Sequence, residues 1–421
     1  MEKVLRSIEK LIPRKIYKFF QPAYHYLLAV TGTIIYRKPS RHIYVIGVTG
    51  TKGKSSTTEF INAALTGAGK KTAILSTIRF KIGNESRPNK FKMTMPGRFF
   101  TQKFLRDAVD AGCEYAIIEM TSEGARFFRH TGIELDALIF TNLSPEHIES
   151  HGSFTKYKAA KLRLVHHLAK SKKPMRLSIA NIDNEHAHSF LISPVEKNIG
   201  YSLKHVHFIS ETENESVIKY HDETITIPLP GRFNVSNTLA ALALTNELGL
   251  PFADVKKGIE SLSLIRGRVE KINCGQDFTV VVDYAHTDDS LRKLYEAFPS
   301  SRKIAVLGST GGGRDGWKRP VLGKIADEYC SEIIITNEDP YDEDPIKIIN
   351  EVASGVTSHT PVIIVDRREA IAKAISLANT GDVVLITGKG TDPYIMGPHG
   401  SKQVWDDATI AKEELEKVVI K

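Results

Sequence analysis

The chain has 421 residues, enough for roughly two to four domains of ordinary size and for more than one buried core. Hydrophobic residues make up 41% of it and charged residues 25%, a balance that is typical of globular proteins and too apolar for a disordered chain. Three widely separated cysteines exclude a disulfide framework and the paired spacing of a zinc site. Because the first residues also lack the apolar core and cleavage site of a secretory signal, we expect a cytoplasmic protein.

The positive charge is concentrated at the beginning of the chain, in residues 1–41, which we call the arm. The arm holds nine Lys or Arg and two Glu, a net charge of +7 out of +8 for the whole chain. Proteins that bind nucleic acid need basic residues spread over a docking face, so this distribution argues against a nucleic-acid partner. An uncharged stretch, residues 19–36, leaves three alternatives for the arm: a membrane span, an interfacial segment at the inner membrane surface, or packing on protein.

From residue 42 onward, short apolar runs alternate with helical patterns. The runs HIYVIGV, KTAILST, YAIIEM and ALIFTNL are continuously apolar, which predicts parallel strands covered on both faces. Residues 196–228 are expected to form antiparallel strands, and a helix pair is expected from Val235 to Ser261. A second series of strands is expected in FTVVVDYAH, RKIAVLGS, SEIIITNEDP, PVIIVD and DVVLITGKG. The sequence therefore predicts an α/β protein with the arm, a central domain at 42–262 and a doubly wound domain at 263–421.

The strongest local motif is GTKGKSS, which follows the predicted strand IYVIGV directly and precedes a predicted helix. In such a turn, backbone N–H groups surround phosphates at the helix N-terminus, the lysine reaches the terminal phosphates and the serine hydroxyl binds magnesium. Val48 stands where the general pattern has glycine, so the loop is a variant form. We predict phosphate binding by Gly50, Thr51, Lys52, Gly53, Lys54, Ser55 and Ser56.

Two further residues follow predicted strands of the same domain. Glu119 ends the strand YAIIEM, and His147 follows the strand ALIF. Because residues at the carboxyl ends of parallel strands meet at the ligand crevice, both are expected near the phosphates, where they complete a magnesium shell. The alternative is a structural role for each, Glu119 as a helix cap and His147 as a buried histidine.

These residues belong to an ordered series of motifs that resembles the Mur ligases, ATP-dependent amide-bond-forming enzymes of bacterial cell-wall synthesis, and among them the UDP-N-acetylmuramoyl-tripeptide synthetase branch. The series covers about residues 42 to 421: GVTGTKGKSS, EMTSEGARFFR, TNLSPEHIESHGSFTKYKAAK, LPGRFNVSNTLAALA, IRGRVE, VVDYAHTDDSL, GGGRDGWKRP, NEDPYDEDP and GKGTDPY. The resemblance implies a P-loop central domain with a mostly parallel sheet, followed by a smaller Rossmann-like domain. This agrees with the two α/β blocks predicted from the pattern.

The resemblance implies ATP and Mg²⁺ as cofactors, and it assigns roles residue by residue. Lys54 and Ser55 match contacts to the phosphates and the metal, and Glu119 and His147 match further metal ligands. Lys161 in YKAAK matches a lysine that the family carbamylates, which turns an ammonium into an anion able to hold a second magnesium ion. Nucleotide contacts are implied for Asn142, Asn237, Arg268 and Asp283, and catalytic roles for Lys54, Lys161, His147 and Arg268.

The implied reaction phosphorylates an acceptor carboxylate with ATP, and the amine of a free amino acid then attacks the acyl phosphate. Thr94, Ser122 and Arg129 match positions that hold the UDP-N-acetylmuramoyl-peptide acceptor. Family members usually carry about 80 to 100 residues before the P-loop, a domain-sized segment that grips the uridine nucleotide. Fewer than 50 residues precede the loop here. We therefore expect a shortened acceptor site, a different acceptor, or one held near the membrane by the arm.

The amino-acid pocket also departs from the family pattern. Members that add diaminopimelate have DNPR, whose arginine clamps a carboxylate, and this chain has Glu338-Asp339-Pro340-Tyr341. GKGHE is replaced by GKGTD, with Asp392 in the acidic position. An acidic pocket suits a basic amino acid such as lysine, unless Arg314 or Lys318 supplies another clamp. The implied donor-binding residues are Arg314, Asp339, Tyr341, Gly388 and Asp392.

Other functions remain as alternatives. Folylpolyglutamate synthase shares the implied fold, but its motifs resemble GTNGKGS and DGAH rather than GTKGKSS and DYAH. Cyanophycin synthetase is disfavoured because no extra ligase domain precedes the loop. A Mur-like scaffold that binds ATP without ligating is disfavoured, because it has no need of a second metal site. A Mur-type ligase with another carboxylate acceptor remains an alternative.

Overall fold

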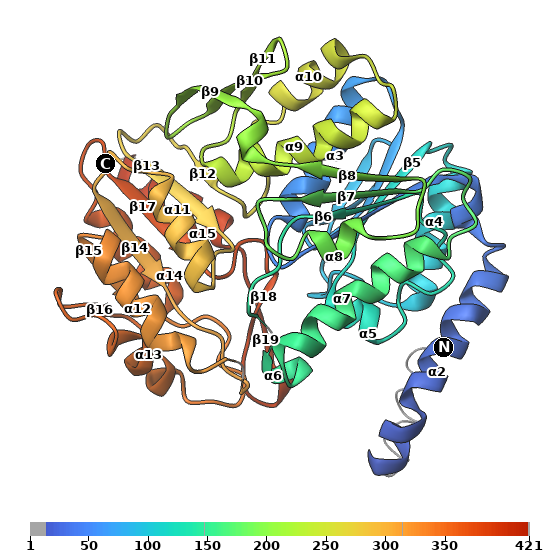
Figure 1. Ribbon diagram of the computed structural model, residues 1–421. Helices are drawn as coiled ribbons and strands as arrows, with labels where there is room; N and C mark the ends of the chain where they lie inside the picture. Colours follow the sequence, from blue (N-terminus) through green and yellow to red (C-terminus); the bar gives the residue numbers. More distant parts are fainter. Residues whose placement is uncertain (1–13, 147, 314, 420–421) are drawn as a thin grey trace. The chain divides into compact units, whose positions relative to one another are not determined.

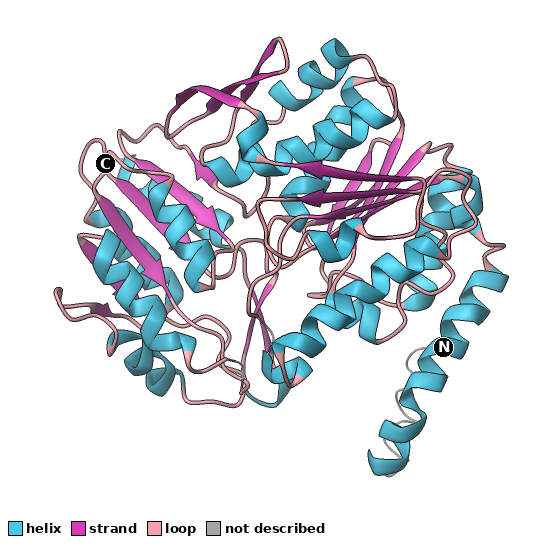
Figure 2. Cartoon of the chain, viewed as in Figure 1, coloured by secondary structure: helices cyan, strands magenta, loops and turns pink. Residues whose placement is uncertain are grey.

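The structure is a computed structural model that describes residues 14–146, 148–313 and 315–419. The chain forms two compact units. The first contains residues up to 144, 155–201 and 243–248, and the second contains residues 145–154, 202–242 and those from 249 onward. Each unit has its own sheet with helices on it (Figure 2), as the alternation of apolar runs and helical patterns predicts.

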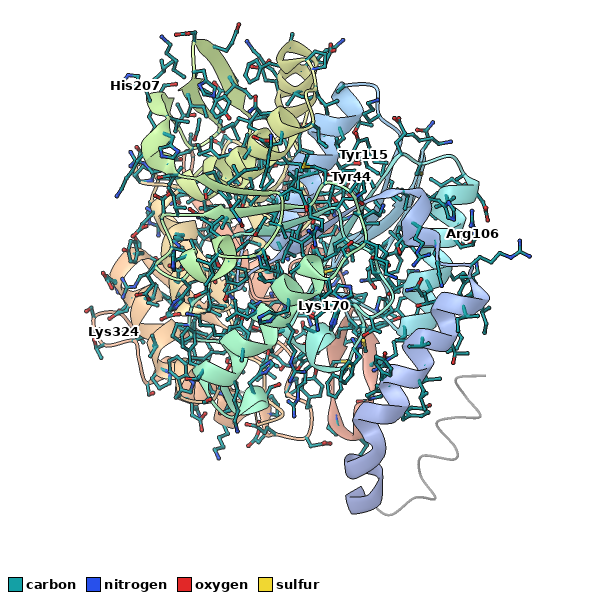
Figure 3. The ribbon with its side chains drawn as sticks, turned by 45° about the vertical axis from the view of Figure 1, so that its right-hand side comes forward. Tyr44, Arg106, Tyr115, Lys170, His207 and Lys324 are labelled. Carbon is teal, nitrogen blue, oxygen red and sulfur yellow. The ribbon has the colours of Figure 1, made fainter. Side chains whose placement is uncertain are left out.

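The first unit is built on an eight-stranded sheet in the order β4-β3-β2-β5-β1-β6-β7-β8. Six of its strands are parallel, and β3 and β4 continue it as an antiparallel edge. Figure 3 shows the rings of Tyr44 and Tyr115 beside one another where β1 and β5 begin, with centroids 5.3 Å apart. The strands are β1 (Tyr44–Thr49), β2 (Thr72–Leu75), β3 (Arg79–Ile82), β4 (Glu85–Pro88), β5 (Tyr115–Glu119), β6 (Ala137–Phe140), β7 (Leu177–Asn181) and β8 (Lys197–Tyr201).

The helices of this unit precede β1 or connect its strands. They are α2 (Arg14–Ile35), η1 (Pro39–His42), α3 (Lys54–Gly67), α4 (Arg98–Asp110), α5 (Ser122–Arg126), α7 (Phe154–Ala169) and α8 (His188–Leu191). One expectation is wrong: Lys197–Tyr201 pairs in parallel with β7 in the main sheet and is not part of the antiparallel appendage. Its polar, exposed residues conceal an edge strand from a search for apolar runs.

The described part of the arm is helical and packs within the first unit. α2 lies against α4 (Figure 1), and the rings of His25 and Tyr26 meet those of Phe127 and Phe128 edge to face at 5.5 and 5.9 Å. This packing agrees with the third alternative for one side of α2, while Leu27 and Ile34 on another side are exposed. Among the helices described, none has both the length and the apolarity needed to cross a bilayer.

The second unit holds a six-stranded sheet in the order β12-β13-β17-β14-β15-β16, parallel except at β12. The five strands expected from the sequence are all present, and a three-stranded antiparallel sheet, β11-β10-β9, precedes them. The strands are β9 (His207–Glu211), β10 (Ser216–Tyr220), β11 (Glu223–Ile227), β12 (Glu270–Ile272), β13 (Thr279–Asp283), β14 (Lys303–Leu307), β15 (Glu332–Ile335), β16 (Val362–Ile363), β17 (Val383–Thr387), β18 (Tyr394–Met396) and β19 (Lys402–Val404).

Two apolar cores cover the two faces of this sheet. Val281, Ala305 and Leu385 pack with residues of α11, α12 and α13, whereas Val280 and Ile304 pack with residues of α14 and α15. This alternation is why the strands are continuously apolar and confirms the doubly wound prediction. The helices from the 145–154 segment onward are α6 (Ile148–His151), η2 (Leu203–His205), α9 (Arg232–Glu247), α10 (Phe252–Glu260), α11 (Asp288–Glu296), α12 (Lys318–Tyr329), α13 (Pro345–Ala353), α14 (Arg367–Ser376), η3 (Pro398–Gly400) and α15 (Asp407–Val419).

Candidate functional site

The GTKGKSS motif forms a tight loop between β1 and α3, as predicted. A Cβ atom at Gly50 would lie 1.9 Å from Thr141 Oγ1, so only glycine fits where the loop passes the end of β6. Gly53, at φ +79°, turns the chain into the helix. Lys54 Nζ donates to the carbonyl oxygens of Gly50 at 3.1 Å and Thr51 at 2.8 Å, so its ammonium lies over the loop. The residues are those of a phosphate-binding loop at a helix N-terminus.

Asn142 holds this loop in shape. Its Oδ1 accepts from the Lys52 N–H at 2.9 Å, its Nδ2 donates to the Lys52 carbonyl at 3.1 Å, and its backbone carbonyl accepts from the Thr51 N–H. The resemblance described above implies a nucleotide contact for Asn142. In the structure, both the oxygen and the nitrogen of its side-chain amide are hydrogen-bonded to the loop. Thr141 and Tyr157 also bond the loop and were not predicted, although Thr141 directly follows the strand ALIF.

Glu119 meets the requirements of a metal ligand. It ends β5 opposite Val48, its side chain is fully buried, and its Oε2 accepts from Thr77 Oγ1 at 2.6 Å. Among the described residues, none hydrogen-bonds its Oε1. A buried carboxylate oxygen without a partner is costly unless a cation or donor satisfies it, and Mg²⁺ prefers such oxygens, as it does the Ser55 hydroxyl. The residues therefore fit Mg²⁺, although the described residues hold no cluster of three or more His, Cys, Asp or Glu.

Lys161 reaches the same loop from α7. Its side chain is buried, and its Nζ donates to the Gly50 carbonyl at 2.6 Å and lies 4.9 Å from the Tyr157 ring centroid. A solvated surface position is the general alternative for a lysine in a sequence. The burial of Lys161 argues against that alternative. His147, the fourth predicted metal ligand, lies outside the described residues.

The predicted acceptor residues gather near Glu119. Thr94 Oγ1 is 2.8 Å from Thr77 Oγ1, and Arg129 donates to the carbonyl oxygen of Met95 at 2.7 Å. Arg129 Nε is buried with no partner among the described residues, and burial lowers the pKa of its guanidinium. Ser122 is buried at the start of α5, the helix that precedes Arg129. A buried guanidinium N–H that lacks an acceptor is suited to an anionic ligand.

The second unit brings Arg268 and Asp283, two of the predicted nucleotide residues, to the end of β13. The Arg268 guanidinium lies over the Tyr284 ring, 4.6 Å from its centroid, and both Asp283 oxygens accept backbone N–H groups, from Val269 and Ala285, at 2.7 Å. Burial raises the pKa of the Asp283 carboxyl. Asp283 was predicted as a ribose contact, and here its carboxylate fixes the IRGRVE segment to the sheet. Asn237 is buried in α9.

The predicted donor residues lie at the carboxyl ends of β15 and β17. Asp339 Oδ1 accepts from Lys389 Nζ and from the Met396 N–H, both at 2.8 Å, and Asp392 lies 3.5 Å from the same ammonium. Gly388 has φ +103°, and a Cβ there would lie 2.4 Å from Glu338 Oε2. Glu338 Oε1 accepts from Thr310 at 2.6 Å, and no described residue bonds its buried Oε2.

Of two further predicted donor residues, Tyr341 is described by the structure and Arg314 is not. Tyr341 has φ +53°, an uncommon conformation for an aromatic residue, and its N–H donates to the Met396 carbonyl at 3.0 Å. Arg314 lies outside the described residues. Lys389 and Thr310 were missed by the sequence analysis, since a lone lysine or threonine in a loop carries no signal until its partner is placed.

Comparison with known proteins supports the same family over most of the chain. The family model described as Mur ligase middle domain matches residues 48–245, and the one described as Mur ligase, glutamate ligase domain matches residues 267–390. The chain is 36% identical to the UDP-N-acetylmuramyl-tripeptide synthetase of Roseiflexus sp. (strain RS-1), over 92% of this chain and 81% of that protein. It is 33% identical to the UDP-N-acetylmuramoyl-L-alanyl-D-glutamate--2,6-diaminopimelate ligase of Clostridium botulinum, over 93% and 80%.

Solved structures agree with this assignment. A UDP-N-acetylmuramoyl-L-alanyl-D-glutamate--2,6-diaminopimelate ligase matches with TM-score 0.61 and 27% identity, over 90% of this chain and 79% of that one. A folylpolyglutamate synthase from Mycobacterium tuberculosis matches with TM-score 0.71 at 16% identity, over 87% and 93%, which shows a shared fold alone. Since the sequence relatives are more than 30% identical over most of both chains, this chain belongs to the Mur ligase family.

Proposed function

We propose that this protein is an ATP-dependent, ADP-forming ligase that joins an amino acid to the carboxylate of a UDP-N-acetylmuramoyl-peptide or a related acceptor in peptidoglycan precursor synthesis. The observation that carries the proposal is the group around Gly50, where the lysines of two different helices, Lys54 and Lys161, both bond one loop carbonyl. The Lys54 cation and a glycine loop at a helix N-terminus favour a polyphosphate, and the buried free oxygen of Glu119 favours its metal ion.

We assign the chain's own residues the following roles. Lys54 and the loop amides would orient the phosphates, while Ser55, Glu119, His147 and Lys161 in carbamylated form would hold Mg²⁺. When bound, the metal neutralises the phosphate charge that grows as the acceptor carboxylate attacks. Arg129 holds the acceptor, with Ser122 and Thr94 beside it, and Arg268, Asn237 and Asp283 serve the nucleotide. We assign these roles to a nucleotide-binding region at 42–262 and an amino-acid-binding region at 263–421.

The donor is proposed to be a basic amino acid rather than diaminopimelate. Several relatives are named as diaminopimelate ligases, yet Tyr341 stands where the carboxylate-clamping arginine is expected. The nearby Asp392 carboxylate and burial raise the pKa of Tyr284 well above its ordinary value. The carboxyl groups of Glu338, Asp339 and Asp392 lie at this end of the sheet, with Lys389 between the last two. An acidic lining stabilises an ammonium group and repels a second carboxylate.

The test is phosphate release measured with a UDP-N-acetylmuramoyl-dipeptide and a panel of amino acids. We expect release only when ATP, acceptor and one amino acid are all present, with a product whose mass matches the amide. Release that needs neither acceptor nor amino acid contradicts the proposed function and favours an ATP-binding scaffold. If diaminopimelate is the best donor by a wide margin, the donor assignment is wrong while the ligase assignment stands.

The proposed location is the cytoplasm, with the arm at the inner membrane surface. No nucleic-acid partner is expected, because the body of the chain beyond the arm carries a net charge of only +1.

A further inference from the structure

The helix α2 presents a row of apolar side chains to solvent. Leu27 and Ile34, seven residues apart and therefore on the same side of the helix, are 63% and 64% exposed. Tyr26 and Ile35 beside them are also at least half exposed. His25, Ala29 and Thr33 are buried against the rest of the first unit. We call Tyr26, Leu27, Ile34 and Ile35 the outer face of α2.

The half of α2 that carries this face is firmly attached. A Cβ at Gly132 would lie 1.9 Å from Thr33 Oγ1, so the helix approaches the 128–133 turn as closely as a glycine permits. The ring contact of His25 with Phe127 fixes the same side, and the half-exposed Tyr26 contacts Phe128 where the two sides meet. The outer face is therefore held open by packing on the opposite side of the helix and is not a result of a loosely attached helix.

Charge indicates what covers the outer face. Arg37, Lys38 and Arg41 are exposed just beyond the helix, and Arg14, Lys15 and Lys18 lie in its first turns. Exposed basic residues next to an apolar helix face match an anionic lipid surface, where each contributes about 1 kcal/mol and the apolar side chains enter the headgroup boundary. A protein partner of comparable fit needs a large acidic rim around an apolar centre, which is a rarer surface.

The buried side of α2 lies on the segment proposed to bind the acceptor. Phe127 and Phe128, which receive the rings of α2, directly precede Arg129, whose buried Nε has no partner among the described residues. A helix that rests on a bilayer through its outer face holds this segment at the lipid surface. We propose that α2 docks on an anionic membrane through Tyr26, Leu27, Ile34 and Ile35, and that the acceptor carboxylate belongs to a muramyl peptide carried on a membrane lipid. The second part rests on the proposed function.

The experiment compares the full chain with Leu27→Glu/Ile34→Glu and with a matched control, Ile192→Glu/Ile209→Glu, which adds the same charge at exposed isoleucines outside α2. Each protein is sedimented with vesicles of equal parts phosphatidylglycerol and phosphatidylethanolamine, and with phosphatidylcholine vesicles. We expect the α2 variant to lose at least about tenfold in affinity for the anionic vesicles, since two apolar side chains no longer insert. Unchanged affinity of the α2 variant, or equal loss in the control, overturns the docking proposal.

Ligation is then measured with a soluble UDP-linked acceptor and with a lipid-linked muramyl peptide in the same anionic vesicles. We expect the α2 variant to lose about tenfold in kcat/KM on the lipid-linked acceptor and to match the control on the soluble one. Equal activity of the two variants on both acceptors, or equal loss on both, contradicts a lipid-carried acceptor. If the wild-type protein binds the vesicles but ligates neither acceptor, the proposed function is wrong and the docking proposal stands.

Discussion

Glu119 shows at the scale of one residue how the fold prepares a metal site. Thr77 has one hydroxyl hydrogen, and because the Glu119 carboxylate accepts it, Thr77 in turn accepts from Thr94. The chain of hydroxyls therefore runs from a predicted acceptor residue to a predicted metal ligand. It fixes Oε2 and leaves Oε1 as the only oxygen of Glu119 without a bond among the described residues.

Thr77 is thus expected to position the metal ligand. Thr77→Val, which keeps the shape and removes the hydroxyl, should weaken Mn²⁺ binding in the presence of ATP by about tenfold, as the loss of a partner of a metal ligand typically does. Thr77→Ser should bind like the wild type. Electron paramagnetic resonance titration of free Mn²⁺ measures this without turnover. Equal Mn²⁺ affinity in all three proteins excludes the positioning role.

Lys161 is expected to act as a carbamate. Lys161→Ala should lose nearly all ligation, and bicarbonate with a short-chain carboxylate should restore part of it by supplying the missing anion at the metal. Lys156→Ala, a change at an exposed position of the same helix, serves as the control and should stay active. Full activity of Lys161→Ala without a rescue agent rules out a metal-binding role.

The pair of His130 and His167 predicts a loss of stability in mild acid. Their rings meet edge to face at 4.8 Å, and burial lowers the pKa of His130 to about 3 and also lowers that of His167. His130 is therefore neutral in the folded protein at pH 5, whereas in the unfolded chain it binds a proton below about pH 6.5, and the lowered pKa of His167 acts in the same direction. Because the unfolded state binds more protons, the free energy of unfolding falls as the pH drops below 6.5, by up to about 1.4 kcal/mol per pH unit from His130.

Urea unfolding between pH 7 and pH 5 measures this slope. His130→Phe removes one of the two protonations and should reduce the slope by about 1.4 kcal/mol per pH unit. The same slope in wild type and variant contradicts this account.

At the scale of the element, a buried ion pair joins helices α14 and α15 to the sheet of the second unit. Arg367 and Asp407 are 2.7 Å apart with both side chains fully buried, and Arg367 also donates to the Thr387 carbonyl at the end of β17. Trp405 Nε1 donates to Asp407 as well. Asp407 therefore has a structural role.

Asp407→Ala should destabilise the protein by about 3 to 5 kcal/mol, because it leaves the Arg367 guanidinium buried without its counter-charge. Asp107→Ala breaks an exposed pair with Lys103 and is the matched control, with an expected cost below about 0.5 kcal/mol. Denaturant unfolding of both variants provides the measurement. A loss below about 1 kcal/mol for Asp407→Ala contradicts the structural role.

For the molecule as a whole, the sequence predicted the sheets better than their edges. The continuous apolar strands β1, β5, β13 and β17 were predictable because both of their faces are buried. The short polar strand β4 was not predicted, since edge strands need no apolar run. The strand β8 was predicted, but in the antiparallel appendage instead of at the edge of the main sheet. Likewise, the motif predicted Lys54 and Glu119, but the partners Thr77 and Lys389 depend on contacts between loops distant in sequence.

The central claim is that ATP activates an acceptor carboxylate as an acyl phosphate before the amine attacks. When the amide forms, the carbon–oxygen bond to phosphate breaks, so the released phosphate keeps one oxygen atom of the acceptor carboxylate. The most direct measurement is therefore mass analysis of phosphate released from a muramyl-peptide acceptor labelled with oxygen-18 in its carboxylate. Phosphate that carries one oxygen-18 atom for each amide formed is the predicted result, and unlabelled phosphate released alongside amide would contradict the account.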